Sequence, residues 1–420
     1  MATIKAELIS HLLKSNNFSA SLSDVKDAIQ KLELQPNYPI ILVAGTNGKG
    51  SCCAYLSTIL TNSGYHVGTF TSPHVFDYNE RIAINNQPID DHNLCNALQS
   101  VITASDINLG LFKTFTLAAH IIFTQQKVDI AIVEVGIGGA QDATNLFEPT
   151  ISAITTVALD HCELLGNTVE EIGLQKAHIY RHNKPAFFGA PQIPQSVLDY
   201  AKQIQAPLEL IGRDFNYTKH QLSWSFHHTE QNLYSLPYPS LRGVEQLDNA
   251  SLALAILTKL REQFPVSLAQ IKTGLLQTTL IGRFQVLAGV PQIILDTAHN
   301  PQAIDTMCEN MLKLPFAKRN FAVFGVAKDK DWQEIILKCY KNFDYWYLAP
   351  INTERAEQTK VIADYLITLG VQSKNIYQTT NIKNAFTQCY QQLTVDDRVI
   401  CFGSFLVVEE ASHAIKEVRA

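Results

Sequence analysis

Val43-Ala44-Gly45-Thr46-Asn47-Gly48-Lys49-Gly50-Ser51 is the stretch from which the fold of this chain can be worked out. The apolar run before it, Ile40 to Ala44, is short and rich in β-branched residues, which is typical of a buried parallel strand. The pattern from Cys52 to Leu60 predicts a helix after it. Glycine-rich turns between a strand and a helix bind phosphates, because backbone N–H groups converge on the anion and the helix N-terminus adds positive potential. The stretch therefore predicts a phosphate-binding loop.

The residue types in this loop suit a nucleotide. Lys49 can reach the β- and γ-phosphates, and the hydroxyl of Ser51 can meet Mg²⁺ or a phosphate oxygen. The match to the standard loop is imperfect, since Val43 stands where that pattern has glycine and Gly50 separates the lysine from the hydroxyl residue. An ordinary glycine turn is the alternative. We predict ATP contacts from Gly45, Thr46, Asn47, Gly48, Lys49, Gly50 and Ser51.

The composition excludes several classes of protein. With 46% hydrophobic and 17% charged residues among 420, the chain resembles a soluble globular protein. A net charge of −6 argues against nucleic acid as the main partner. No run approaches the roughly 18 apolar residues of a membrane span, and Met1 to Phe18 lacks the apolar core of a signal peptide. Eight cysteines without a Cys-x-x-Cys pair predict free thiols in the cytoplasm.

Two α/β domains are predicted from the order of strand and helix patterns. Further apolar strands near 67–71, 129–135 and 151–159 follow the first one, and a second alternation of strands and helices begins near residue 285. We expect an N-terminal P-loop-type ATP-binding domain with a mostly parallel sheet at 1–284. A smaller Rossmann-like α/β domain is expected at 285–420.

Three polar residues are expected at the carboxyl ends of parallel strands, where such sheets bind ligands. They are Ser72, Glu134 and His161. Oxygen and nitrogen atoms of these types, with phosphate oxygens and water, suit Mg²⁺ or Mn²⁺. The alternative for Glu134 is a carboxylate paired in the core, and a histidine such as His161 often has only a structural role.

The second domain carries candidates of its own. Asp296-Thr297-Ala298-His299-Asn300-Pro301 closes a strand and opens a helix, and its Asp and Asn could be plain N-caps. Arg283 has a guanidinium suited to bidentate phosphate contact, although such a residue is more often part of a surface salt bridge. The run Lys328-Asp329-Lys330-Asp331 could be only a solvated charge cluster.

Taken together, these strings resemble the folylpolyglutamate synthase/dihydrofolate synthase family of the Mur ligase superfamily, over Leu22 to Glu417. Other Mur ligases normally have a nucleotide-sugar domain before the loop, and the roughly 40 residues present here are too few for one, which favours the folate branch. The motifs that carry the resemblance are Ala-Gly-Thr-Asn-Gly-Lys-Gly-Ser (44–51), Thr-Ser-Pro-His (71–74), Asn-Glu-Arg-Ile (79–82), Glu-Val-Gly-Ile-Gly-Gly (134–139), Asp-Ala-Thr-Asn (142–145), Ala-Leu-Asp-His (158–161), Gly-Arg-Phe (282–284), Asp-Thr-Ala-His-Asn-Pro (296–301) and Gly-Ser-Phe (403–405).

The resemblance implies an ATP-dependent ligase of the carboxylate–amine type. ATP would phosphorylate a carboxylate of a pterin substrate, and the amine of L-glutamate would attack the acyl phosphate to form an amide. The implied substrates are dihydropteroate and reduced folates, and the implied cofactor is Mg²⁺, with one or two ions. The family also implies a monomer, and the charge and the lack of a long apolar run predict neither nucleic acid nor membrane as a partner.

The resemblance also assigns roles to single residues. Lys49, Lys176 and His161 form the implied catalytic set, and Lys176 matches a lysine that is carbamylated in this family. Ser72, Glu134 and His161 match metal ligands. Nucleotide contacts are implied for Asn249, Arg283, Asp296 and His299, and pterin contacts for Phe115 and Asp142.

The chain departs from the family pattern at several positions. Thr116 stands where a glutamate usually follows the phenylalanine at 115, and Ala140 stands where arginine is usual. His178, Ile281 and Leu406 replace a glycine, a proline and a histidine. Two other hypotheses therefore stay open, a phosphate-loop NTPase or kinase without glutamate ligation, and a binding protein that has lost catalysis.

Overall fold

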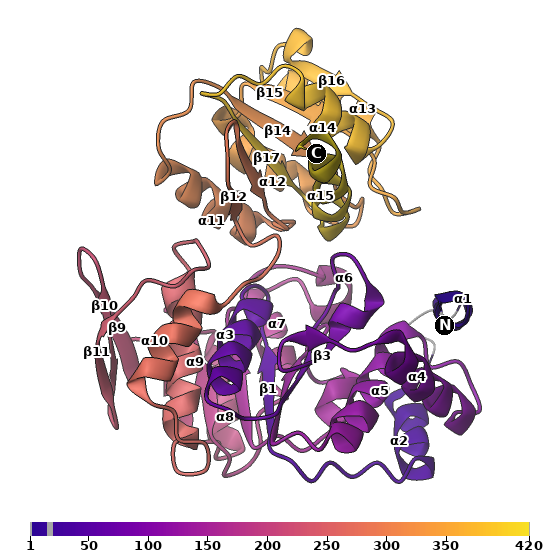
Figure 1. Cartoon of the computed structure of the whole chain (residues 1–420), viewed down its shortest axis with the longest axis vertical. Helices are drawn as coiled ribbons and strands as arrows, with labels where there is room; N and C mark the ends of the chain where they lie inside the picture. The colour runs from indigo at the N-terminus through magenta and orange to yellow at the C-terminus, as the bar shows by residue number, and fades with distance from the viewer. Residues whose placement is uncertain (1, 15–19, 420) are drawn as a thin grey trace. The chain divides into compact units, whose positions relative to one another are not determined.

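The computed structural model describes residues 2–14 and 20–419, which form two compact units (Figure 1). The first unit contains residues 1–158, 162–240 and 247–278, and the second contains 159–161, 241–246 and 279–420. Of the segment 1–18, which we expect not to be a signal peptide, residues 1 and 15–18 lie outside the described residues. In the part of the chain that is described, no helix is long and apolar enough to cross a membrane.

The first unit is built on one large sheet. Within the described residues it has eight strands in the order β4-β3-β2-β5-β1-β6-β7-β8, and from β2 to β8 all neighbours are parallel. The strands are β1 (Ile40–Ala44), β2 (Val67–Phe70), β3 (Ile82–Ile84), β4 (Gln87–Pro88), β5 (Ile130–Glu134), β6 (Ile151–Ile154), β7 (Ala186–Phe188) and β8 (Leu208–Leu210). This sheet confirms the predicted α/β class.

Helices connect these strands, as parallel pairing requires. The helices before residue 279 are α1 (Ala2–Leu13), α2 (Leu22–Lys31), α3 (Lys49–Asn62), α4 (Asp91–Ala104), α5 (Leu111–Gln126), α6 (Cys162–Leu165), α7 (Val169–Ala177), α8 (Gln195–Gln203), α9 (Gln246–Leu260) and α10 (Leu268–Gln277). A separate antiparallel sheet consists of β9 (Phe215–Lys219), β10 (Trp224–His228) and β11 (Asn232–Leu236).

The strand predicted at 151–159 ends early. β6 stops at Ile154, and the residues after it bond to the last residue of β1, Ala44, and to the phosphate loop. The Thr46 N–H donates to Thr156 O at 2.8 Å, and the Thr155 hydroxyl donates to Asn47 O at 2.6 Å. His161 therefore lies in a loop well beyond the strand end, where it was not expected.

The second unit is a smaller α/β layer. In its described part, six strands have the order β12-β13-β17-β14-β15-β16, and only β12 runs antiparallel to its neighbour. These strands are β12 (Gln285–Leu287), β13 (Gln292–Leu295), β14 (Asn320–Phe324), β15 (Tyr345–Leu348), β16 (Ile376–Gln378) and β17 (Arg398–Phe402). Its helices are α11 (Pro301–Leu312), α12 (Trp332–Cys339), α13 (Thr359–Thr368), α14 (Ile382–Tyr390) and α15 (Phe405–Arg419).

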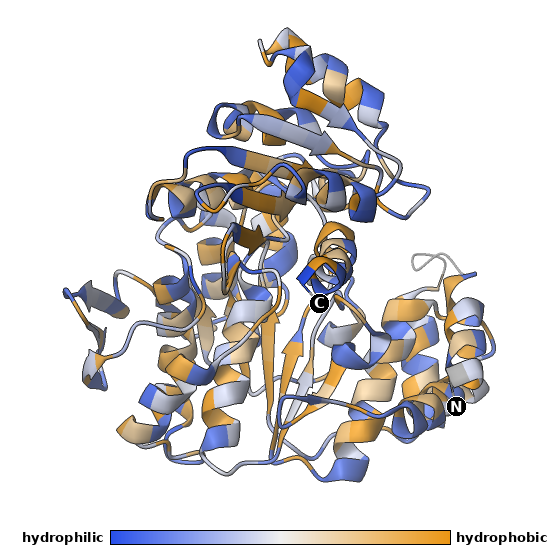
Figure 2. Cartoon of the chain, turned by 45° about the horizontal axis from the view of Figure 1, so that its top comes forward, coloured by the Kyte–Doolittle hydropathy of each residue, from blue (hydrophilic) through white to orange (hydrophobic). Residues whose placement is uncertain are grey.

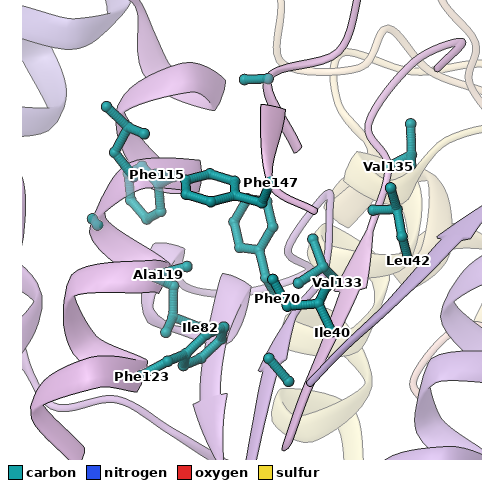
Figure 3. Packing of buried hydrophobic residues seen from close by; sticks show 14 of the residues in the cluster. Ile40, Leu42, Phe70, Ile82, Phe115, Ala119, Phe123, Val133, Val135 and Phe147 are labelled. Carbon is teal, nitrogen blue, oxygen red and sulfur yellow. The ribbon is translucent and has the colours of Figure 1, made fainter. Parts of the chain in front are cut away.

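Apolar strands fill the core of each unit. Every residue of β1, β2 and β5 is buried, which explains the continuous hydrophobic runs in the sequence (Figure 2). In the first unit, aromatic side chains pack between the sheet and α5 (Figure 3). They include Phe70, Phe115, Phe123 and Phe147. All eight cysteines lie among the described residues and carry free thiols.

Candidate active site

The phosphate loop has the backbone shape that its glycines predict. Gly48 is the N-cap of α3 with a φ of 87°, and Gly45 has a φ of 151°. Both angles disfavour any residue with a Cβ. A Cβ at position 45 would also lie 1.9 Å from Thr155 Oγ1. The loop therefore holds its backbone against Thr155, which follows β6, and presents the N-terminus of α3, which is an anion-binding geometry.

Lys49 folds back over this loop. Its Nζ donates to Gly45 O at 3.0 Å and to Thr46 O at 3.2 Å. The ammonium thus lies over the turn in which phosphates bind in such loops. Carbonyl oxygens hold it there until an anion offers a stronger, charge-assisted partner.

Asn249 in α9 lies beside the same loop. The residue is 5% exposed, and its Nδ2 has no hydrogen-bond partner among the described residues. A Cβ on Gly48 would lie 2.5 Å from Asn249 Oδ1, so the two residues are in close contact. A buried amide without a partner is costly unless a ligand supplies one. The structure thus brings Asn249 next to the predicted nucleotide site.

Lys176 reaches the phosphate loop from α7. Its side chain is buried, and its Nζ donates to Gly45 O at 3.2 Å. The second glycine-rich loop allows this approach, because a Cβ on Gly139 would lie 2.7 Å from Gln175 O. Two lysines, Lys49 and Lys176, therefore share one backbone carbonyl of the phosphate loop.

Ser72 and Glu134 meet at the ends of β2 and β5. The Ser72 N–H donates to Glu134 Oε2 at 3.2 Å, and Glu134 is 3% exposed. A buried carboxylate with a nearby hydroxyl supplies the oxygen ligands that Mg²⁺ and Mn²⁺ prefer, so this pair fits a divalent cation. His161 belongs to the second unit. The metal-binding set of Ser72, Glu134 and His161 therefore stays a prediction. Among residues 2–14 and 20–419, no group of three or more His, Cys, Asp or Glu side chains is arranged to hold a metal ion.

Asp142 organises the second glycine-rich loop. Its Oδ2 accepts from the N–H groups of Gly136 and Ile137, and its Oδ1 accepts from the N–H and hydroxyl of Thr144. Burial raises the pKa of this carboxyl, although the four hydrogen bonds oppose the rise. The predicted pterin residue Asp142 thus also fixes the shape of the loop.

Phe112, in the first turn of α5, lies against this loop. A Cβ on Gly136 would lie 2.6 Å from the Phe112 ring, whereas Phe115 is fully buried and has the Arg81 guanidinium over its ring. The sequence analysis named Phe115 and did not name Phe112. The available signal was that Phe112 follows Gly110 and Leu111 at the N-terminal end of α5. Phe115 as a pterin contact stays a prediction, which its burial does not favour.

At three of the positions that depart from the family pattern, the polar groups have hydrogen-bond partners nearby in the structure. The Thr116 hydroxyl donates to Phe112 O at 2.9 Å within its own helix. The Ala140 N–H donates to Gln175 O at 3.0 Å, and the His178 Nδ1 lies 2.7 Å from Leu174 O. Beside Phe112, the charged residue Lys113 is 9% exposed, and burial lowers its pKa while the Asp142 charge opposes the change.

In the second unit, Arg283, Asp296 and His299 surround the end of β13. Arg283 donates to the Thr297 hydroxyl and lies 5.1 Å from the centre of the Phe405 ring. Burial raises the pKa of Asp296 to about 7. Burial, together with the Lys330 charge, lowers the pKa of His299 to about 4. The structure brings these three predicted residues together and leaves the imidazole neutral near pH 7.

Comparisons with known proteins identify the family of this chain. Residues 43–257 match the Mur ligase middle domain, and residues 282–405 match the glutamate ligase domain of Mur ligases. A dihydrofolate synthase/folylpolyglutamate synthase of Buchnera aphidicola subsp. Schizaphis graminum is 35% identical over 371 residues, which are 88% of this chain and 86% of that protein. The chain belongs to the dihydrofolate synthase/folylpolyglutamate synthase family. It is therefore a member of a family of ATP-dependent ligases.

Other members of the dihydrofolate synthase/folylpolyglutamate synthase family extend the comparison. The Escherichia coli (strain K12) enzyme is 33% identical over 388 residues, with 92% of this chain and 89% of that protein covered. The structure of E. coli FolC in complex with DHPP and ADP has a TM-score of 0.92 and 32% identity, and covers 99% of this chain and 98% of that one. Another family structure, with Mn, AMPPNP and L-glutamate bound, has a TM-score of 0.87 and 34% identity, with 98% and 96% covered. Solved relatives thus bind a nucleotide and a divalent metal.

Proposed function

We propose that this chain joins L-glutamate to dihydropteroate and to reduced folates, with ATP as the energy source. The observation that carries the proposal is the phosphate loop with Lys49, Lys176 and the unpartnered amide of Asn249 around it, in a chain of this family. The names of the relatives and the ligands in their structures support the substrate classes.

The proposed chemistry has two steps. A carboxylate oxygen of the pterin substrate attacks the γ-phosphorus of ATP, which forms an acyl phosphate and releases ADP. The amine of L-glutamate then attacks the acyl carbon, loses a proton and expels inorganic phosphate, so that an amide remains. Lys49 and the loop N–H groups bind the phosphates, and they stabilise the charge that builds up during transfer.

The metal would be Mg²⁺, bound by Ser72, Glu134 and His161. When bound, it would neutralise negative charge on the transferred phosphoryl group. The buried position of Lys176 beside Gly45 suits a carbamate at its Nζ, which would convert a cation into a further oxygen ligand for a second ion.

The remaining contacts are inferred from the family resemblance and from the residues that lie beside each side chain. We place Asn249, Arg283, Asp296 and His299 at the nucleotide. Asp142 and Phe112 line the proposed pterin pocket, together with Phe115 if that ring becomes accessible on binding. We further propose a cytoplasmic monomer with small-molecule partners and without nucleic acid or membrane.

The test is phosphate release from Mg-ATP. One series contains L-glutamate and 7,8-dihydropteroate, and a second contains L-glutamate and a reduced monoglutamyl folate. Turnover that requires both glutamate and a pterin is the expected result, and the ratio of the two rates gives the preferred substrate. Release without glutamate would instead indicate an NTPase or kinase, and ATP binding without turnover would indicate a binding protein.

A further inference from the structure

Asp160 is the centre of a side-chain cluster in the second unit. Its Oδ1 accepts from Lys330 Nζ at 2.7 Å, and its Oδ2 accepts from Asn300 Nδ2 at 3.3 Å. The same Oδ2 lies 3.7 Å from His299 Nε2, and Lys330 Nζ lies 3.5 Å from His161 Nε2. One carboxylate thus gathers residues from the 159–161 segment, the start of α11 and the loop before α12.

The ion pair at the centre is largely buried. The side chains of Asp160 and Lys330 are 10% and 12% exposed. Burial alone would raise the pKa of Asp160, but the Lys330 ammonium beside it keeps that pKa well below its usual range. Removing two charges from water offsets most of their attraction, so such a pair is a weak source of stability compared with apolar packing. Within the run 328–331 only Lys330 is withdrawn from solvent, because Lys328, Asp329 and Asp331 are exposed.

The orientation of His299 leaves Asp160 to other donors. Its Nδ1 lies 2.7 Å from Thr297 O, which can only accept, so the proton is assigned to Nδ1. Nε2 then has no proton to donate to Asp160, and Lys330 and Asn300 are donors to this carboxylate. Lys330 is the cation of this cluster, and its three N–H groups give it more donors than its bond to Asp160 uses.

We propose that Asp160 is a positioning residue, which holds the Lys330 ammonium beside His161 and His299 so that it binds a phosphate oxygen of ATP or of the acyl phosphate. The inference rests on the proposed function, in which His299 and His161 lie near the nucleotide and the metal. A free lysine side chain samples many rotamers, and its bond to Asp160 restricts them before the phosphate arrives. A cation fixed in this way stabilises transferred charge without reorganising during the reaction.

The test compares Asp160→Asn, Lys330→Met, Lys330→Arg and the double variant Asp160→Asn/Lys330→Met. We expect Asp160→Asn to lower kcat roughly 10- to 100-fold, as misplaced groups do, with the KM for the pterin unchanged. Lys330→Met should have a similar effect, and the double variant should be no worse than Lys330→Met alone. Lys330→Arg should recover part of the activity, because it keeps the charge.

Two further measurements keep the outcome decisive. Lys338→Met removes a lysine that pairs with Asp305 in the same unit, and it should leave kcat unchanged. Calorimetric binding of Mg-AMPPNP should weaken about 10-fold in Asp160→Asn and in Lys330→Met but not in Lys338→Met. If the wild-type protein turns over no pterin, the proposed function fails, and the binding series still decides the role of Asp160. Unchanged kcat and unchanged AMPPNP affinity, or losses that simply add in the double variant, would overturn the inference.

Discussion

The Lys49 ammonium is held over the phosphate loop by hydrogen bonds to that loop. It binds two carbonyl oxygens of its own loop, and neither of these is a charged partner. We expect Lys49→Ala to lower kcat/KM for ATP roughly 10²- to 10³-fold, because a charge that stabilises phosphoryl transfer is lost. Steady-state phosphate release measures the effect. The exposed lysine Lys202 in α8 is the matched control, and an equal loss in Lys202→Ala would show that the change is not specific to the loop.

Alanine variants at Gly48 and Gly64 can distinguish backbone strain from a steric clash. Their φ angles are 87° and 91°, so alanine is strained at both. A Cβ at 48 would meet Asn249 Oδ1 at 2.5 Å, whereas nothing lies within 4 Å of a Cβ at 64. We expect Gly64→Ala to cost about 1 kcal/mol of the free energy of unfolding. Gly48→Ala should cost about 1–3 kcal/mol more and weaken ATP binding, because Asn249 must move.

Urea denaturation and calorimetric ATP titration measure these two effects. The difference between the two variants is the informative quantity, since the strain is common to both. Equal stabilities and equal ATP affinities would mean that Asn249 gives way without cost, and that its contact with the loop is unimportant.

Helix α5 places two phenylalanines, one turn apart, in different environments. Phe112 lies against Gly136 at the edge of the loop, and Phe115 is buried in the core. We expect Phe112→Leu to raise the KM for dihydropteroate several-fold, with a loss of unfolding free energy below about 1.5 kcal/mol. Phe115→Ala should instead cost about 3–5 kcal/mol, because it leaves a cavity in a packed core.

Steady-state kinetics and urea denaturation of both variants distinguish the two positions. If the KM for dihydropteroate rises in a stably folded Phe115 variant and does not change in Phe112→Leu, Phe115 and not Phe112 is the pterin contact. The helix itself follows from sequence periodicity, but its rotation about its axis decides which of the two rings faces the loop.

Acid stability is a property of the molecule as a whole, and His120 in its core contributes to it. Burial lowers the pKa of His120 to about 3, and its ring packs on Phe147 and bonds to the Tyr38 hydroxyl. The unfolded chain takes up a proton below a pKa near 6.5, whereas the folded chain does not. The stability tied to the neutral ring is therefore complete above pH 6.5 and is lost as the pH falls from 6.5 toward 3.

Urea denaturation at pH 7 and pH 5 tests this expectation. Between these values wild type should lose about 1–2 kcal/mol more of its unfolding free energy than His120→Gln. His92→Gln, at an exposed position in α4, should follow wild type. Identical pH dependence in wild type and His120→Gln would show that this ring does not contribute.

The amino-acid sequence by itself determined the α/β class, the phosphate loop, and the strand and helix on either side of that loop. Buried parallel strands and amphipathic helices leave their periodicity in the local sequence, and glycines mark a turn that only they can form. For this reason the prediction of β1 agrees with the structure in both bounds, and the two-part α/β arrangement was expected. The roles of the site residues could be named only through family resemblance.

Tertiary structure alone decided which side chains meet. Lys176 bonds to a carbonyl 131 positions away, and Asp160 pairs with a lysine 170 positions away. It also ended β6 at Ile154, moved His161 off the strand end and turned Phe112 toward the loop. Periodicity reports only interactions among neighbours along the chain, whereas these contacts depend on how distant segments pack, which no local pattern encodes.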